Sequence, residues 1–150
     1  MTLFMCGRGG LRVERVRTVL VCGSLRWTDA APVRRVLSGL RREGYTVLLH
    51  GAAPGVDSLA GRAAEEMGFV VQPWPAEWGR HGRSAGPIRN GNMLRYGRPE
   101  LVVALTDDLS RSRGTADMVR QARAAGVTVR VVPLSSSRLA ADEGGVRSEV

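Results

Sequence analysis

Five short apolar segments, separated by gaps long enough for helices, constrain the fold of this chain more than any other feature. They occupy residues 18–23, 46–51, 69–74, 101–106 and 127–132. Their first residues lie 28, 23, 32 and 26 positions apart, which leaves room for a helix in every gap and argues against tight hairpins between them. Most are continuous and β-branched, as is typical of strands covered on both faces. The pattern predicts a parallel sheet.

The gaps carry the periodicity of amphipathic helices. In the first gap, the apolar residues recur at helical spacing: Val33, Val36, Leu37 and Leu40. Asp29 is a suitable N-cap for this helix, and Gly44 a suitable C-terminal stop. Similar patterns predict helices at about 56–67, 87–96 and 115–125.

A chain of 150 residues with this alternation is expected to form one three-layer α/β domain with a five-stranded parallel sheet. We expect the domain to span residues 18–133, with a basic N-terminal tail at 1–17 and a flexible C-terminal tail at 134–150. Ligands of such sheets bind beyond the carboxyl ends of the strands. Functional residues should therefore lie in the loops that follow each strand.

Charge points to an anionic partner. The net charge of +8 comes from 22 arginines, with no lysine, against 14 acidic residues. Residues 1–17 hold four arginines, and residues 80–98 hold five arginines and no acid. This distribution favours a nucleotide or a nucleic acid as partner. For the N-terminal cluster, a solvated basic face that only aids solubility is the alternative.

Other compositional features exclude several classes of protein. No apolar run approaches the ~20 residues that cross a bilayer, and the basic, glycine-rich start does not resemble a signal peptide. We therefore expect a cytoplasmic protein with no membrane partner. Two cysteines and two histidines make no metal-ligand cluster, so neither a metal nor another cofactor is expected.

Three of the loops suit an anion. The expected ligand-binding residues are Gly23, Ser24, Arg26 and Trp27 after the first strand, His50, Gly51 and Asp57 after the second, and Gly114 and Thr115 after the fourth. Glycines, hydroxyls and free N–H groups at a helix start are a common way to hold phosphate. The alternatives are an ordinary turn after the first strand, a helix cap at Asp57 and a structural histidine at His50.

The loop after the third strand, residues 73–90, is the longest and the best candidate for a site. From it we expect Trp78, Gly86, Arg89 and Asn90 to reach the ligand. All three tryptophans of the chain fall just beyond strand ends, which allows either base stacking or packing that holds the loop together.

These motifs, in this order, resemble the YspA-type, cpYpsA-related SLOG family over roughly residues 18–133. The segments that carry the resemblance are GSLRWTD, HGAAPGVDSLA, PAEWGRHGRSAGPIRNGNM, and RGTADM followed by AGVTVRVV. The resemblance implies a Rossmann-like three-layer sandwich that binds a nucleotide or nucleotide-derived ligand. It also implies a mobile-element, phage or stress-related context.

A related branch, the LOG-type phosphoribohydrolases, cleaves the N-glycosidic bond of nucleoside monophosphates through an arginine and a PGGxGTxxE motif. Arg89 resembles that arginine, and Gly114 and Thr115 resemble the phosphate-binding pair. Met118 stands where the resemblance requires the catalytic glutamate. Whether the chain is an enzyme is therefore left open.

We rank a sensor or binding domain for a nucleotide-derived small molecule first. A nucleotide N-glycosidase is second, in which Asp57 or Glu77 replaces the missing glutamate and Arg89 assists. Nucleic-acid binding through the basic tail is third. A homo-oligomer is left open.

Overall fold

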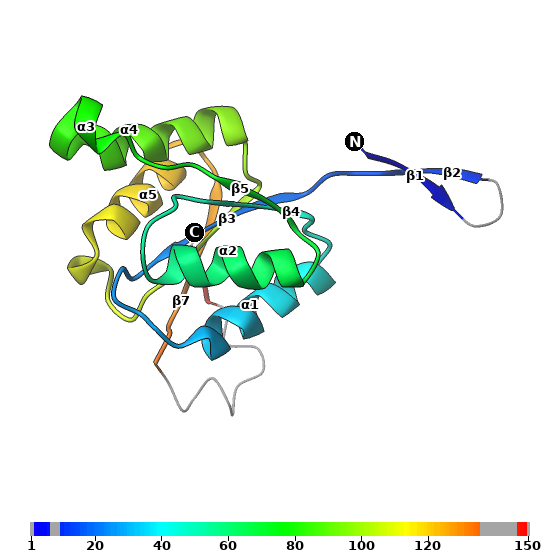
Figure 1. The fold of residues 1–150 in the computed structure, drawn as a ribbon, viewed down its shortest axis with the longest axis horizontal. Coiled ribbons are helices and arrows are strands. Elements are labelled where there is room, and N and C mark those ends of the chain that lie inside the picture. The colour runs from blue at the N-terminus through cyan, green and yellow to red at the C-terminus, as the bar shows by residue number, and fades with distance from the viewer. Residues whose placement is uncertain (1, 7–9, 136–146, 150) are drawn as a thin grey trace.

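A six-stranded sheet organises the computed structural model, which describes residues 2–6, 10–135 and 147–149 (Figure 1). Its strands are β3 (Thr18–Gly23), β4 (Val47–His50), β5 (Val70–Pro73), β6 (Leu101–Leu105), β7 (Thr128–Val132) and β8 (Arg147–Glu149). They run in the order β5-β4-β3-β6-β7-β8. The first five in this order are parallel, as predicted, and β8 adds an antiparallel edge next to β7.

Helices cover both faces of the sheet. They are α1 (Ala30–Arg42), α2 (Val56–Glu66), α4 (Ala85–Asn92) and α5 (Arg113–Ala124). Asp29 caps α1 as expected, because its Oδ1 accepts a hydrogen bond from the Ala31 N–H at 3.0 Å. The predicted third helix differs, since α4 passes into a π-helical segment, η2 (Met93–Gly97). Three short helical pieces complete the elements: α3 (Trp78–His81), η1 (Gly82–Ser84) and η3 (Leu109–Arg111).

Alternate side chains of the strands supply two cores. Val19 and Val21 of β3 pack in the cluster that contains the apolar faces of α1 and α2. Leu20, between them, packs in the cluster that contains Met93 and the buried residues of α5. This alternation builds the three layers of the expected Rossmann-like sandwich. Strand order reverses between β3 and β6, so the crevice where such folds bind ligands lies between the loops that follow these two strands.

The two ends of the chain have more structure than the expected tails. Strands β1 (Thr2–Cys6) and β2 (Gly10–Glu14) pair as an antiparallel hairpin that extends from the body of the molecule (Figure 1). Strand β8 falls within the expected C-terminal tail, whereas residues 136–146 and 150 of that tail lie outside the described residues. The division into a domain and two tails stays a prediction.

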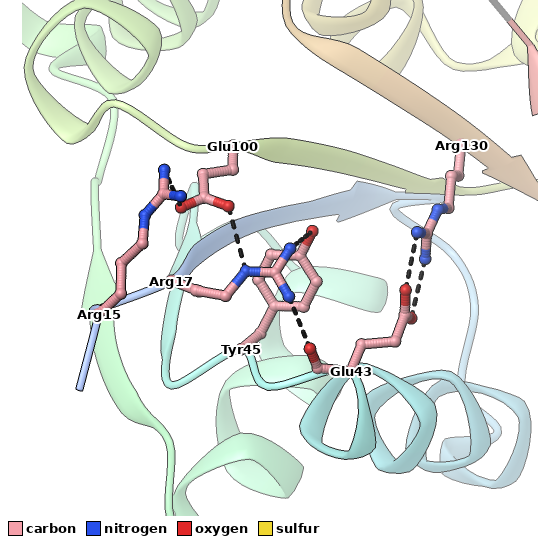
Figure 2. A network of polar contacts seen from close by, with 6 residues as sticks. All are labelled: Arg15, Arg17, Glu43, Tyr45, Glu100 and Arg130. Atoms are coloured by element: carbon pink, nitrogen blue, oxygen red, sulfur yellow. Dashed lines mark hydrogen bonds and ion pairs between the residues drawn. The ribbon is translucent and has the colours of Figure 1, made fainter.

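Arg17, at the expected end of the N-terminal tail, is the centre of a polar network at the amino edge of the sheet (Figure 2). Its Nε donates to Glu100 Oε2 at 3.2 Å, Nη1 to the Glu43 carbonyl at 2.6 Å and Nη2 to the Tyr45 hydroxyl at 3.1 Å. The guanidinium carbon also lies 4.2 Å from the centroid of the Tyr45 ring. Arg130 of β7 joins the network through two hydrogen bonds to the Glu43 carboxylate, 2.8 and 2.9 Å long.

These contacts tie β3 to the end of α1 and to the strands beside it, on the edge opposite the crevice.

Among the helices that the structure describes, none is long and apolar enough to cross a membrane.

Candidate functional site

A small cavity of about 40 Å³ opens at the carboxyl edge of the sheet. Four segments that are distant in the sequence line it: Cys22, Gly23 and Leu25; Gly51, Ala53 and Asp57; Arg89, Asn90 and Met93; Ser112, Gly114 and Thr115. The set includes seven residues that we predicted to bind ligand: Gly23, Gly51, Asp57, Arg89, Asn90, Gly114 and Thr115. Their convergence follows from the parallel strands, because each of these loops leaves the sheet at the same edge.

Close backbone contacts shape this cavity and explain Gly23. A Cβ on Gly23 would lie 2.8 Å from Val56 Cγ2, and it would also overlap the Leu105 carbonyl oxygen. The next residue, Ser24, donates its N–H to that same carbonyl at 3.1 Å and accepts a hydrogen bond from the Val56 N–H at 3.0 Å. The turn after β3 therefore packs directly against the start of α2.

Asp57, in the first turn of α2, is the buried carboxyl group of the cavity and only 5% exposed. Its Oδ2 accepts hydrogen bonds from the N–H groups of Gly51 at 3.0 Å and Ala53 at 3.3 Å. Burial raises the pKa of Asp57 to about 6, against the opposing effects of these N–H groups and of Arg89. No hydrogen bond to Oδ1 is found among the described residues, and none of their fully buried side-chain polar atoms lacks a partner. Oδ1 is therefore not fully buried, and Asp57 is one of the residues that line the cavity.

Arg89 of α4 reaches across to the loop after β4. Its Nε donates to Asn90 Oδ1 at 2.9 Å, and its Nη1 donates to the carbonyls of Gly51 and Trp74. A Cβ on Gly51 would overlap the guanidinium, so only glycine permits this approach. Burial lowers the pKa of Arg89, while Asp57 opposes the shift. Within the described part of the chain, Nη2 has no hydrogen-bond partner, which leaves its two N–H groups for a ligand.

The first turn of α5 faces the same cavity with uncommitted N–H groups. The N-cap residue, Ser112, makes no side-chain cap, and its hydroxyl donates to Thr115 Oγ1 at 2.7 Å. The amides that open a helix have no partner within it. A Cβ on Gly114 would meet no heavy atom within 4 Å, so open space lies in front of this turn. With Arg89 Nη2, these amides form an arrangement suited to an anion.

Asn90 connects this turn to α4. It is 3% exposed, and its Nδ2 donates to the Gly114 carbonyl at 3.2 Å and to Asp117 Oδ2 at 2.9 Å. Asp117 was missed by the sequence analysis, which considered only its neighbour, Met118. Met118 is completely buried in the core beneath α5 and does not reach the cavity.

A second, larger cavity of about 430 Å³ adjoins Arg89, which lines both spaces. The rest of its lining comes from the loop after β5, from α3 and from α4: Trp74, Pro75, Glu77, Arg80, His81, Ala85, Ile88 and Asn92. Glu77 lies here, exposed, with its Oε2 3.6 Å from Arg80 Nη1 and 3.7 Å from His81 Nε2. This volume falls within the usual range of ~300–1,000 Å³ for small-molecule sites.

Other predicted ligand-binding residues lie outside both cavities. Trp27 packs partly buried against the α1–α2 core, and its Nε1 donates to the Asp29 carbonyl at 2.6 Å. His50 is buried, burial lowers its pKa, and its Nδ1 accepts the Ala52 N–H at 3.0 Å. Both side chains thus bond to backbone atoms of their own loops, and their predicted role in ligand binding stays a prediction.

The remaining four are Ser24, Arg26, Trp78 and Gly86. Ser24 lines neither cavity and makes the two backbone hydrogen bonds described above. Arg26 is exposed. Trp78 is 60% exposed, and a Cβ on buried Gly86 would lie 3.5 Å from the Trp78 ring atom Cη2. This packing places Gly86 beneath the start of α3, beside the larger cavity.

Cys22 is a lining residue that the sequence analysis did not select. It stands one position before Gly23 at the carboxyl end of β3, which is the one signal that could have identified it. Burial is the main cause that raises the pKa of its thiol, so the group stays protonated. No group of three or more possible metal ligands occurs in the part of the chain that the structure describes.

Comparison with known proteins gives three similarities. The model of the YspA, cpYpsA-related SLOG family matches residues 17–81. The gene 61 protein of Mycobacterium phage D29 is 40% identical over 121 residues, which cover 76% of this chain and 94% of that protein. The X-ray structure of DNA processing protein A from Streptococcus pneumoniae aligns with a TM-score of 0.62 and 22% identity, over 85% of this chain and 54% of that chain. This chain thus spans about half of that protein, with which it shares the fold.

Proposed function

This chain belongs to the YspA, cpYpsA-related SLOG family, as its motifs led us to expect, and from that membership we propose that it binds a nucleotide-derived ligand at the carboxyl edge of the sheet. It acts in this proposal as a sensor or binding domain. The phage relative supports a mobile-element context. The family model ends at residue 81, so the roles of Arg89, Gly114 and Thr115 rest on the geometry of this chain.

One observation carries the proposal: Arg89 lines two cavities of unequal size. The small cavity suits a phosphate group, because it is lined by Arg89 and by the first turn of α5, whose amides are uncommitted, and because it has no room for a base. The larger cavity offers the apolar surfaces of Trp74 and Ile88 to a base or sugar. A nucleotide has this division between a compact anion and a larger, flatter body.

An N-glycosidase is the second candidate, and Asp57 is the observation in its favour. A carboxyl group with a pKa of about 6 and an oxygen that is not fully buried can serve as a general acid or base near neutral pH. Glu77 is the weaker choice, because it is exposed and lies beside the side chains of Arg80 and His81. We rank hydrolysis below binding because no carboxylate occupies the position of Met118.

Nucleic-acid binding remains the third candidate. The solved structure with the same fold is called a DNA processing protein, and Arg83, Arg95 and Arg98 are exposed around α4 and η2. Arg15 and Arg17 contribute less than the sequence analysis assumed, because both contact Glu100.

Two measurements test the proposal. Mass spectrometry of the purified protein under native conditions should detect a co-purifying nucleotide-derived molecule and identify it. Calorimetry should then show that nucleoside monophosphates bind at least about tenfold more tightly than the matching nucleosides, since hydrogen bonds to a charged group contribute roughly 1.5–3 kcal/mol. Equal affinities for nucleotide and nucleoside would reject the phosphate site.

A further inference from the structure

We propose that the small cavity binds its phosphate together with one proton, which the phosphate and Asp57 share, so that a terminal phosphate monoester is held as its singly charged form. This inference rests on the proposed function, because it concerns the same phosphate site. In this proposal, Asp57 determines in which protonation state the ligand is bound.

A phosphate bound in the small cavity would contact Asp57. The cavity holds only about 40 Å³, and the carboxyl group lines it together with Arg89 and the α5 turn that would attract the anion. Asp57 Oδ2 is fixed by two backbone N–H groups, so the carboxyl group is held in place. Its other oxygen, Oδ1, is the one that a ligand oxygen would contact.

Among the described residues that line this cavity, Arg89 is the one cationic side chain that faces the two acidic groups. Arg89 of α4 is the cation that acts on Asp57, and the Cys22 thiol of β3 stays protonated and brings no positive charge. The lining residues from α5 are Ser112, Gly114 and Thr115, which do not ionise near neutral pH. His50 of β4 is neutral near pH 7, since burial lowers its pKa.

When two acidic groups share one site, the pKa of one of them rises strongly. A phosphate monoester loses its second proton with a pKa of ≈6, close to that of Asp57 before ligand binds. Because the phosphate and Asp57 bind a proton about equally strongly, a hydrogen bond is favoured in which one proton lies between a phosphate oxygen and Oδ1. The complex therefore takes up a proton whenever both free partners are ionised.

The test is the pH dependence of affinity for inorganic phosphate, measured on wild type and on Asp57→Asn. Above about pH 7, wild-type affinity should fall about tenfold for each pH unit, because one proton is taken up on binding. In Asp57→Asn the side-chain amide donates to the dianion, so affinity should change little and exceed wild type at least tenfold at pH 8. Glu66→Gln is the matched control, since Glu66 is exposed at the far end of the same helix, and it should behave as wild type.

A second measurement needs no variant and so does not depend on how Asp57→Asn folds. Calorimetry of wild type at pH 8, in two buffers with different ionisation enthalpies, should give uptake of about one proton per bound phosphate. Phosphate binding without proton uptake and without a pH slope would overturn this inference and leave the proposed function standing. No phosphate binding by either protein at any pH would overturn both.

Discussion

The Asn90 side-chain amide donates to Asp117 Oδ2 over 2.9 Å. Gln121 Nε2 donates to the same oxygen at 2.8 Å, and Arg120 pairs with Oδ1. Both oxygens of the Asp117 carboxylate, which Asn90 links to the Gly114 carbonyl, are therefore occupied by side chains of α4 and α5. Since Met118 is buried in the core, this turn presents no carboxylate for cleavage of a glycosidic bond.

We accordingly expect slow or absent hydrolysis of ordinary nucleoside monophosphates. Met118→Glu should not create activity, and it should lower the free energy of unfolding by several kcal/mol, because an unpaired carboxylate in a core is among the costliest changes. Met118→Leu, the matched control, should cost less than about 1.5 kcal/mol. Release of free base and thermal unfolding are the measurements. Rapid release by wild type that Asp57→Asn or Glu77→Gln abolishes would reverse the ranking of binding over hydrolysis.

Gly114 offers the cleanest way to test the anion site. Thr115 is 3% exposed, so a larger residue there would disturb packing, whereas a side chain on Gly114 would enter open space. Gly114→Glu should weaken binding of nucleoside monophosphates at least tenfold, because the added carboxylate repels the phosphate. Gly114→Gln, of nearly equal size, should weaken it much less. Calorimetry that shows equal effects for the two variants would mean that the charge is not near the phosphate.

Arg89 supports the loop after β4 and, in the proposed function, also binds the ligand phosphate, so a substitution there should change both stability and affinity. Arg89→Lys cannot reproduce the bonds to Asn90, Gly51 and Trp74 while also reaching a phosphate. It should lower the melting temperature and weaken nucleotide binding about tenfold or more. Arg95→Lys is the control, as Arg95 is exposed and lies over the Tyr96 ring. A lower melting temperature with unchanged affinity would leave Arg89 as a brace only.

The pKa of Asp57 makes a prediction about stability. Because burial raises this pKa from 3.8 to about 6, the fold favours the neutral carboxyl group. The contribution of Asp57 to the free energy of unfolding is then greatest below pH 3.8 and is lost as pH rises through about 6. Relative to Asp57→Asn, wild type should lose up to about 3 kcal/mol across this range, at ~1.4 kcal/mol per pH unit. Urea unfolding from pH 4 to 8 measures the difference, and a constant difference would contradict a buried carboxyl group.

The sheet could be predicted from sequence because its order comes from local patterns. Continuous apolar runs identified the five parallel strands, and Asp29 with the Val33–Leu40 stripe located α1. The hairpin β1–β2 and the edge strand β8 could not be found in this way, because their pairing depends on contacts that no short pattern specifies. The π-helical end of α4 likewise departs from the regular spacing that the analysis assumed.

The site was predictable to the extent that it lies on one edge. Motif spacing placed Asp57, Arg89 and Thr115 on segments that line one cavity, although it could not tell lining residues from supporting ones. His50 and Trp27 lie at the same edge yet turn toward backbone atoms. Asp117 was missed because its role depends on a contact with Asn90, 27 positions away.

We expect that residues 1–16 can be deleted but that Arg17 must be kept. Deleting residues 1–16 removes β1, β2 and the pair between Arg15 and Glu100, in which the Arg15 side chain is 75% exposed. Such exposed pairs contribute only ~0–1 kcal/mol, and every contact of Arg17 in Figure 2 remains after the deletion. The shortened chain should therefore keep its fold and its affinity for nucleotide.

Any nucleic-acid binding by the arginines of residues 1–16 should disappear with this deletion. In the full chain such binding should weaken steeply with salt, since phosphate contacts release counterions. Arg17→Ala in the shortened chain should then lower the free energy of unfolding by about 1–3 kcal/mol, because hydrogen bonds to Glu100, the Glu43 carbonyl and Tyr45 are lost together. Thermal unfolding measures the stability of the shortened chain and of its Arg17→Ala variant, and calorimetry measures nucleotide affinity. Filter binding at two salt concentrations measures nucleic-acid binding. A shortened chain that folds but no longer binds nucleotide would instead make residues 1–16 part of the binding domain.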